Sequence, residues 1–163
     1  MLYHGIRRAE LAKLKVKDYS QTRRGVAHLR VKGKGGKMRF VPTHPATLTL
    51  IEEYLEAAGH RQDQDAPLFR PVKNNVHGHT MTALTPDSIY FEVVLKYLKM
   101  LGIFGENMGP HVMRATAATN ALDNGADIAK VQEWLGHANI ATTRIYDHRK
   151  TRPEDSPTFK VSY

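Results

Sequence analysis

Hydrophobic and polar residues alternate in two short runs near the start of the chain. The runs are VAHLRV, from Val26 to Val31, and MRFVP, from Met38 to Pro42, and the glycine-rich stretch KGKGGK joins them. Two alternating runs around a glycine-rich turn predict a β-hairpin. We expect the preceding VKDY stretch, residues 16–19, to supply a third strand.

Helical spacing of apolar residues appears on both sides of this hairpin. Residues 7–13 read as a helix, with leucines at helical spacing at Leu11 and Leu14. A second helix after the hairpin is predicted by one apolar stripe, and Gly59 stands where its C-cap belongs. The stripe consists of Leu48, Ile51, Tyr54 and Leu55.

The second half of the chain predicts a loop followed by four helices. Residues 59–84 are rich in Asp, Asn, His, Gly and Pro, which predicts a surface loop. Thr85-Pro86-Asp87 is a strong helix start, with Thr as N-cap and Pro in the first turn. The four helices are expected from there to Leu101, from Pro110 to before Gly125, from Asp127 to Leu135 with Gly136 as the stop, and from Ala141 through Tyr146. We expect the tail RPEDSPTFKVSY to be a docked, β-prone extension.

These elements make a mixed α+β fold, mostly helical, with a small antiparallel sheet near the N-terminus. The 163 residues suit a single domain. Their formal net charge of +8 favours a polyanionic partner, with nucleic acid as the first candidate. An acidic membrane surface and simple solubility are the alternatives. The absence of cysteine excludes disulfides, thiol nucleophiles and cysteine-based zinc sites. No secretory signal and no apolar run of about 20 residues is present, so we expect a soluble, cytoplasmic protein.

The first chemical motif is GPHVMRAT, residues 109–116. His111 and Arg114 are three positions apart, which places them on one face of a helix. Pro110 puts both near the first turn, where free backbone N–H groups favour an anion. The plainer interpretation is that His111 caps the helix and Arg114 is a solvated charge.

The second motif is LGHANIATTRIYDH, residues 135–148. His137 directly follows the glycine that ends a helix, and Tyr146 lies nine residues later. As purely structural residues, His137 would satisfy the terminal carbonyls and Tyr146 would pack its ring into the core. Neither explanation accounts for a segment so rich in Thr, Asn and His.

Two weaker motifs lie in the first 40 residues. In GIRRAEL, Arg7 and Glu10 are three positions apart, so Glu10 can orient the guanidinium, although an ordinary surface ion pair has the same spacing. At the hairpin tip, Lys32, Lys34 and Lys37 alternate with glycines that let a phosphate approach the backbone closely. The alternative for the tip is a flexible basic turn.

Taken together and in this order, the motifs resemble the tyrosine recombinase family, which includes the phage integrases. The resemblance covers almost the whole chain, and PHVMRATAAT with LGHANIATTRIYDH is its most specific part. It implies that Glu10 supports the first catalytic arginine. It also implies a catalytic set made of Arg7, Lys34, His111, Arg114, His137 and Tyr146. Ala115 stands where the family often has His, and we expect no catalytic loss from it.

The resemblance also implies a reaction. The two arginines and His137 would hold the oxygens of a DNA phosphate while Tyr146 attacks it, with His111 as the base. Lys34, or else Lys32 or Lys37, would give a proton to the leaving 5′-oxygen. The intermediate would be a 3′-phosphotyrosine, formed without cofactor, metal or ATP. Further DNA contacts are expected from Arg8, Lys32, Lys37 and Arg144.

The implied partner is double-stranded DNA, bound by a homo-tetramer when the protein is full-length, with no membrane and no small-molecule substrate. We expect a bacterial cytoplasmic protein that joins the nucleoid when bound to DNA. Residues 1–163 would be one catalytic domain, with 151–163 as an extension. The family's N-terminal DNA-clamping domain is expected to be absent, through excision or a truncated gene. The alternatives are a type IB topoisomerase-like enzyme and an inactive DNA-binding remnant. His77-Gly78-His79 is expected to be surface loop, with adventitious zinc binding as the alternative.

Overall fold

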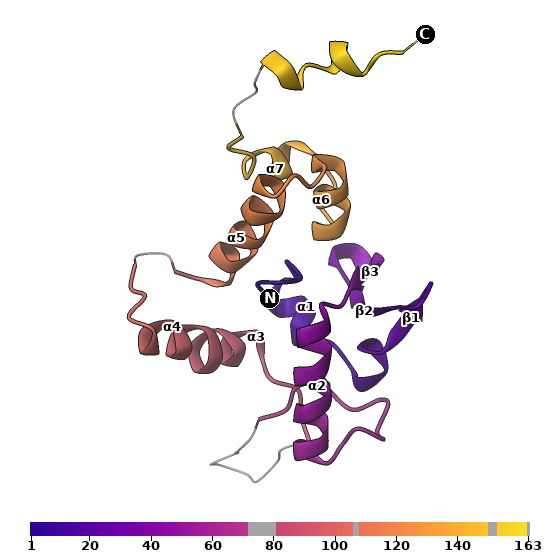
Figure 1. The fold of residues 1–163 in the computed structure, drawn as a ribbon. Helices are drawn as coiled ribbons and strands as arrows, with labels where there is room; N and C mark the ends of the chain where they lie inside the picture. Colours follow the sequence, from indigo (N-terminus) through magenta and orange to yellow (C-terminus); the bar gives the residue numbers. More distant parts are fainter. Residues whose placement is uncertain (72–80, 106–107, 150–152, 163) are drawn as a thin grey trace.

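The computed structural model describes residues 1–71, 81–105, 108–149 and 153–162, apart from the side chains at positions 34, 155 and 160. Figure 1 shows a small sheet with α1 and α2 on one side of the molecule and the helices α5 to α7 on the other. The predicted fold class, mixed α+β with an antiparallel sheet near the N-terminus, is confirmed. Within the described residues, no helix has the length and apolar character needed to cross a bilayer.

The sheet has three antiparallel strands in the order β1-β2-β3. Their bounds are Gln21–Arg23 for β1, Val26–Lys32 for β2 and Met38–Pro42 for β3, so the predicted hairpin is confirmed. In the register of β2 and β3, Leu29 lies opposite Val41, and Val31 lies opposite Arg39. Leu29, Val31 and Val41 are buried, so this face of the hairpin packs on the core.

The prediction of a third strand from VKDY is wrong. Val16–Asp18 forms a short 3-10 helix, η1, and the third strand comes from the residues after it. The cause is Asp18, whose carboxylate accepts the backbone N–H of Lys15 at 2.9 Å and so caps a turn. The N–H of Val16 donates to the carbonyl of Ala66 at 3.0 Å, which ties the turn to a distant segment.

Two helices and the sheet enclose the larger core. Helix α1 (Arg8–Leu11) is shorter than predicted, and α2 (Pro45–Ala58) ends at the predicted C-cap glycine, Gly59. The buried side chains of α2 are Ile51 and Leu55, as its apolar stripe predicts. They pack with residues of the sheet and of the segments beside it, among them Ile6, Leu14, Val16, Leu29, Val31, Val41 and Leu68.

The segment after α2 differs from the predicted surface loop. Ala66 and Leu68 are buried, and the N–H of Leu68 donates to the carbonyl of Leu14 at 2.8 Å. The first part of this segment therefore closes the core under α1. His77-Gly78-His79 lies outside the described residues.

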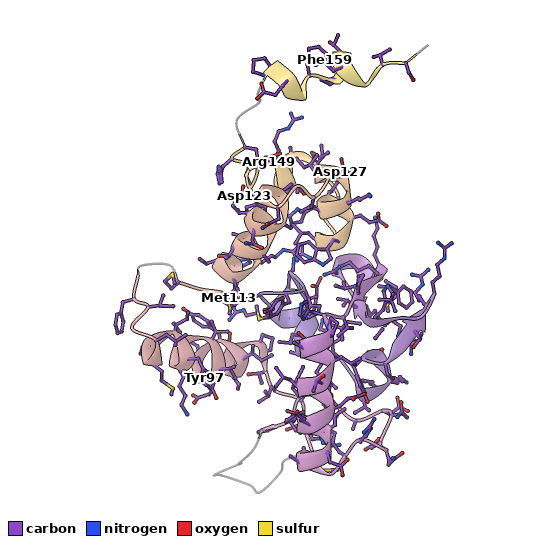
Figure 2. All side chains as sticks on the ribbon, in the orientation of Figure 1. Tyr97, Met113, Asp123, Asp127, Arg149 and Phe159 are labelled. Atoms are coloured by element: carbon purple, nitrogen blue, oxygen red, sulfur yellow. The ribbon has the colours of Figure 1, made fainter. Side chains whose placement is uncertain are left out.

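The helix predicted from Thr85 to Leu101 is confirmed in extent. It consists of α3 (Pro86–Ser88), a π-helical stretch η3 (Ile89–Leu95) and α4 (Lys96–Met100). The hydroxyl of Thr85 accepts the N–H of Ser88 at 3.0 Å, which is the predicted N-cap. Several apolar side chains on this helix are exposed, including Tyr97 on α4 (Figure 2).

The remaining helices form a second, smaller core. They are α5 (Pro110–Asp123), α6 (Ile128–Leu135) and α7 (Ala141–Arg144), close to the predicted bounds. Their buried side chains are Ala118, Leu122, Val131 and Leu135. Trp134 packs against both cores and so joins the two halves of the molecule.

Arg149 closes the outer end of this second core. Its guanidinium donates to the carbonyls of Leu122 and Ala126 at 3.3 and 3.4 Å. Figure 2 shows it at the same end of the helices as Asp123 and Asp127. The end of α5 and the start of α6 are therefore tied to the chain that follows α7.

The tail beyond residue 152 forms two 3-10 turns, so the β-prone prediction is wrong. These turns are η4 (Pro153–Asp155) and η5 (Pro157–Lys160), and each begins with a proline whose fixed φ suits a helical first turn. Phe159 and Val161 are exposed, at 75% and 58% of their surface. Figure 1 shows the tail pointing away from both cores.

Candidate active site

A groove of about 590 Å³ lies where the two halves of the molecule meet. The start of α1, the hairpin tip and the chain after α6 supply its walls. Its lining includes Arg7, Gly33, Arg39, Glu133, His137 and Thr142. Two of the predicted catalytic residues, Arg7 and His137, therefore share one groove although they are far apart in the sequence.

Arg7 and Glu10 form the predicted pair at the start of α1. Arg7 is the N-cap of this helix, and its Nη1 lies 2.9 Å from Oε1 of Glu10. The backbone N–H of Arg7 donates to Oε2 of the same carboxylate at 2.8 Å. Only 5% of the Glu10 side chain is exposed, against 36% for Arg7. The pair is therefore a fixed part of the site with its arginine facing the groove, unlike an ordinary surface ion pair.

Arg39 on β3 is a second partner of Glu10 that the sequence analysis missed. Its Nη1 and Nη2 donate to Oε1 and Oε2 of Glu10 at 2.9 and 2.8 Å, and its Nε donates to the carbonyl of Trp134 at 3.2 Å. Burial acts to raise the pKa of Glu10, but the hydrogen bonds from Arg39 and Arg7 outweigh it and lower that pKa to about 2. Glu10 is therefore ionised at neutral pH.

A signal for Arg39 was present in the strand pattern. Arg39 lies two positions before Val41, so both side chains point to the same face of the strand. Because Val41 is an apolar residue of the hairpin face that packs on the core, an arginine beside it needs a buried carboxylate partner. Glu10, in the first turn of a short helix, is the carboxylate that meets this need.

Arg114 is buried, with 4% of its surface exposed. Its Nη1 donates to the carbonyl of Gly5 and its Nη2 to the carbonyl of Leu135, so the side chain spans both halves of the molecule. Burial lowers the pKa of Arg114 to about 10, assisted by the positive charge of Arg7 and partly opposed by Glu10. The guanidinium stays charged at neutral pH, and its other N–H groups are not engaged by these carbonyls.

Gly5 is required where Arg114 docks. Its φ is +54°, and a Cβ at this position would lie 2.6 Å from Cδ2 of Leu135. Any side chain would therefore push Leu135 away from Gly5 and separate the two carbonyls that hold the guanidinium. This explains the glycine two residues before Arg7.

His137 follows the end of α6 and lies at the floor of the groove. Its Nδ1 is 2.9 Å from Oγ1 of Thr143, a fully buried residue of α7 that the sequence analysis did not single out. Burial lowers the pKa of His137 to about 4, and the positive charges of Arg114, Arg7 and Arg39 add to this effect. The imidazole is therefore neutral at neutral pH.

Tyr146 lies beside His137. Their ring centroids are 6.2 Å apart, and the Tyr146 ring packs against the second core. The tyrosine is two residues beyond α7, so the prediction that it lies within this short helix is wrong by half a turn. Its N–H still donates to the carbonyl of Thr143 at 3.0 Å, which continues the helical turn. The side chain is half-buried.

The structure does not bring the other predicted residues into contact with this cluster within its described part. His111 is exposed on the first turn of α5, and no hydrogen bond within the described residues joins it to Arg114 or Tyr146. Lys34 begins a 3-10 turn, η2 (Lys34–Gly36), at the hairpin tip, and its side chain lies outside the described part of the structure. Arg8 pairs with Asp87 at 2.9 Å.

Three predicted DNA contacts are exposed, and they are Lys32, Lys37 and Arg144. Lys37 also lines the groove. Among the residues that the structure describes, no three histidine, aspartate or glutamate side chains come together in a way that suits a metal ion.

Comparison with known proteins places this geometry in a family. Residues 1–152 match the sequence model of the Phage integrase family. The tyrosine recombinase XerD of Listeria innocua is 37% identical over 146 residues, which cover 88% of this chain and 46% of the relative. The tyrosine recombinase XerA of Pyrococcus horikoshii is 37% identical over 149 residues, which cover 91% of this chain and 47% of the relative. The chain thus spans about half the length of these curated relatives.

Solved structures agree with the sequence matches. The crystal structure of XerA recombinase superimposes with a TM-score of 0.71 and 32% identity, covering 91% of this chain and 50% of that one. The XerH site-specific recombinase, bound to palindromic difH substrate in a post-cleavage complex, superimposes with a TM-score of 0.71 and 31% identity. That match covers 91% of this chain and 40% of XerH.

Proposed function

Because the chain belongs to the phage integrase family of tyrosine recombinases, we propose that it is the catalytic domain of a site-specific DNA recombinase. In this proposal residues 1–163 form one catalytic domain, with 151–163 as its extension. The domain cuts one DNA strand by forming a covalent bond to Tyr146 and later rejoins the strand. The observation that carries the proposal is the clustering of the motif residues around His137. Arg7 shares a groove with His137, the Tyr146 ring lies beside it, and the charge of the buried Arg114 acts on it.

The electrostatics of the groove support phosphate chemistry. The positive charges of Arg7, Arg39 and Arg114 all act on His137, and Glu10 is the buried carboxylate that offsets part of them. The transition state of phosphoryl transfer carries extra negative charge on the non-bridging oxygens. Guanidinium groups fixed before the substrate arrives stabilise that charge without reorganisation, which accelerates the step.

His137 takes the role of a neutral hydrogen-bond donor in this scheme. With the hydroxyl of Thr143 donating to Nδ1, the single ring proton is on Nε2. Nε2 then donates to a non-bridging phosphate oxygen. The low pKa of His137 favours this form, because a charged imidazole would add to the repulsion among the arginines. Thr143 is therefore assigned as the residue that holds the orientation of the His137 ring.

The covalent step exchanges one phosphate ester for another. The phenolic oxygen of Tyr146 forms a bond to phosphorus, and the bond from phosphorus to the 5′-oxygen breaks. We assign the acceptance of the tyrosine proton to His111 and the protonation of the leaving 5′-oxygen to Lys34, on the family resemblance. Religation is the reverse: the free 5′-hydroxyl attacks phosphorus and the Tyr146 oxygen leaves. The ester energy is kept in the protein–DNA bond.

The proposed partner is double-stranded DNA, bound by a homo-tetramer of the full-length protein. The net charge of +8 supports a polyanionic partner, and XerH, a relative by structure, has been solved with its difH substrate. Four cations are proposed to contact the DNA backbone, of which all but Arg8 are exposed. These are Arg8, Lys32, Lys37 and Arg144.

A covalent-capture experiment tests this function. The protein is incubated in EDTA with nicked duplexes taken from the DNA that flanks its gene, and the products are separated on a denaturing gel. We expect a shifted, protease-sensitive band that Tyr146→Phe abolishes, while the DNA affinity of this variant is nearly unchanged. Tyr97→Phe, at an exposed position on α4, is the matched control and should keep the band.

Two results would count against the proposal. A band that persists in Tyr146→Phe would mean that another nucleophile forms the bond. Loss of the band together with loss of DNA binding would mean that Tyr146 serves the fold or the interface instead of the chemistry.

A further inference from the structure

We propose that Arg39 is a positioning residue that fixes Arg7 through Glu10 and His137 through the end of α6, so that both meet the same phosphate. The proposal rests on the phosphate-transfer function given above. It adds a residue that the family motifs in this sequence did not single out. Arg39 is the one side chain of the described residues that bonds both to the α1 pair and to the α6 terminus.

The first link runs from Arg39 through Glu10 to Arg7. Each oxygen of Glu10 accepts one hydrogen bond from Arg7 and one from Arg39, at 2.8 to 2.9 Å. Four bonds leave the carboxylate no freedom to turn or shift. Arg7 is the most exposed member of this cluster. Glu10 and Arg39 are more deeply covered, and they therefore fix the orientation of the Arg7 guanidinium.

The second link runs from Arg39 to the chain that carries His137. Its Nε donates to the carbonyl of Trp134 at 3.2 Å, in the last turn of α6. Two residues later, Gly136 packs so closely that a Cβ there would lie 3.2 Å from Cδ of Arg39. The path of the chain between Trp134 and His137 is therefore shaped against the Arg39 side chain.

A third contact lies at the hairpin tip. A Cβ on Gly33 would be 3.4 Å from Nη1 of Arg39, so the strand end that leads to the tip also packs on this guanidinium. Arg39 thus touches the three segments that line the groove.

The same geometry argues that Arg39 does not itself hold the phosphate. Nε, Nη1 and Nη2 each already donate to a protein acceptor. Its side chain is 14% exposed, against 36% for Arg7. Three of its five N–H groups are thus engaged within the protein, two of them by the carboxylate that also holds Arg7, so we assign Arg39 to act on the substrate through its neighbours.

The chain offers a matched control in Arg30. Arg30 is on the neighbouring strand β2, and it pairs with the capping carboxylate of Asp18 at 2.7 Å. It does not line the groove that holds Arg7 and His137. Arg30→Met and Arg39→Met therefore remove the same charge and a similar ion pair from the same sheet.

The test measures the rate of covalent attachment to a nicked duplex and, separately, the dissociation constant of that duplex. For Arg39→Met we expect the rate to fall about 100-fold, the scale of a misplacement near 1 Å, with the dissociation constant changed less than about threefold. Arg30→Met should change neither. If Arg39→Met does not fold, Arg39→Lys keeps the charge without the fork and carries the same comparison.

A double-mutant cycle shows whether Arg39 acts through Glu10. If it does, adding Arg39→Met to Glu10→Gln costs far less than the loss caused by Arg39→Met alone. Additive losses, or a loss of DNA affinity as large as the loss of rate, would overturn the proposal, because Arg39 would then act independently or on the DNA directly.

A measurement without strand cleavage separates this proposal from the proposed function. Inorganic phosphate is titrated into the protein while the side-chain N–H signals of Arg7 are followed by NMR. We expect phosphate to perturb Arg7 in the native chain and in Arg30→Met, and to bind Arg39→Met about tenfold more weakly. Equal binding by Arg39→Met overturns the role of Arg39, whereas normal phosphate results without any covalent product would overturn only the recombinase chemistry.

Discussion

Two regions of this molecule share one local design. In each, a carboxylate in the first turn of a short helix accepts the N–H of the residue that caps it, and an arginine from the sheet bonds to the same carboxylate. Glu10 has Arg39 as its sheet partner, and Asp18 has Arg30. Both carboxylates are buried. As helix caps the two regions are equivalent.

They differ in what surrounds the arginine. Arg39 uses both oxygens of Glu10 and a backbone carbonyl of α6, and 14% of its side chain is exposed. Arg30 bonds to a single oxygen of Asp18 and is 34% exposed.

The capping residues differ as well. Arg7 lines the groove, whereas Lys15 extends to a surface carboxylate, Asp65. A capping box thus becomes part of a site only where its N-cap faces a groove and a second element holds its carboxylate.

The largest effect that separates the two regions is expected from Glu10→Gln. The neutral amide cannot satisfy both guanidinium groups, so a buried charge on Arg39 loses its partner. We expect the free energy of unfolding to fall by about 3 to 5 kcal/mol, measured by urea denaturation. Covalent attachment to nicked DNA should fall as well, because Arg7 is released. A loss below about 1 kcal/mol would show that the two regions are energetically alike.

Acid should reduce the contribution of Glu10 to the free energy of unfolding. The pKa of Glu10 is about 2 in the folded chain, against an ordinary value of 4.5. Its contribution to stability is therefore complete above about pH 4.5 and is lost as the pH falls through about 2. The gap in unfolding free energy between the native chain and Glu10→Gln should narrow by about 2 kcal/mol from about pH 5 to about pH 3. A gap that stays constant would mean that the carboxylate is not held by the arginines.

Crowding around Arg39 is tested with two glycines of the same conformation. Gly136 and Gly59 both follow a helix with φ near +67°, but nothing lies within 4 Å of a Cβ on Gly59. Gly59→Ala should cost about 1 kcal/mol from its backbone alone. Gly136→Ala should cost about 1 to 2 kcal/mol more, because the methyl group meets Arg39. Thermal or urea unfolding of the pair checks this, and equal losses would remove the crowding argument.

The smallest effect is expected from Asp18→Asn. The amide oxygen still accepts the N–H of Lys15, and Arg30 is exposed enough to regain water. We expect the unfolding free energy to drop by no more than about 0.5 to 1 kcal/mol and covalent attachment to DNA to stay unchanged. If Asp18→Asn reduced covalent attachment to DNA, the pair of Asp18 and Arg30 would belong to the site as well, and the two regions would not differ in function.

The elements set by local pattern were predictable from the sequence. The hairpin, α2 with Gly59, and α6 with Asp127 and Gly136 have periodic apolar residues and explicit caps, which act within a few residues. The strand predicted at VKDY failed because alternation and a capped turn look alike over four residues. Asp18 decided the outcome through a hydrogen bond to Lys15.

Motifs in the sequence predicted several residues that the structure brings near one another. Of the residues named from the sequence, Arg7 and His137 line one groove. Glu10 is bonded to Arg7, Tyr146 lies beside His137, and Arg114 is buried between the two halves of the molecule. Their roles in the reaction remain predictions. His111 is exposed on the first turn of α5, so the three-residue spacing in HVMR did not bring it against Arg114.

The missed residues owe their positions to tertiary contacts. Arg39 bonds to Glu10, which is 29 positions away in the sequence, and to Trp134, which is 95 positions away. Thr143 meets His137 only because the turn between α6 and α7 folds back on itself. Such pairings leave no period in the sequence, although a charged residue on the core face of a strand is a usable hint.

The contacts of Arg114 determine which part of the site can fold first during synthesis. Its guanidinium bonds to Gly5, 109 positions earlier, and to Leu135, 21 positions later. A chain emerging from the ribosome can pair Arg39 with Glu10 early, since a loop of 29 residues costs little entropy to close. Arg114 can dock fully only after synthesis has passed Leu135. We therefore expect a chain that ends before Leu135 to lack both the docked Arg114 and the Tyr146 that the proposed cleavage requires.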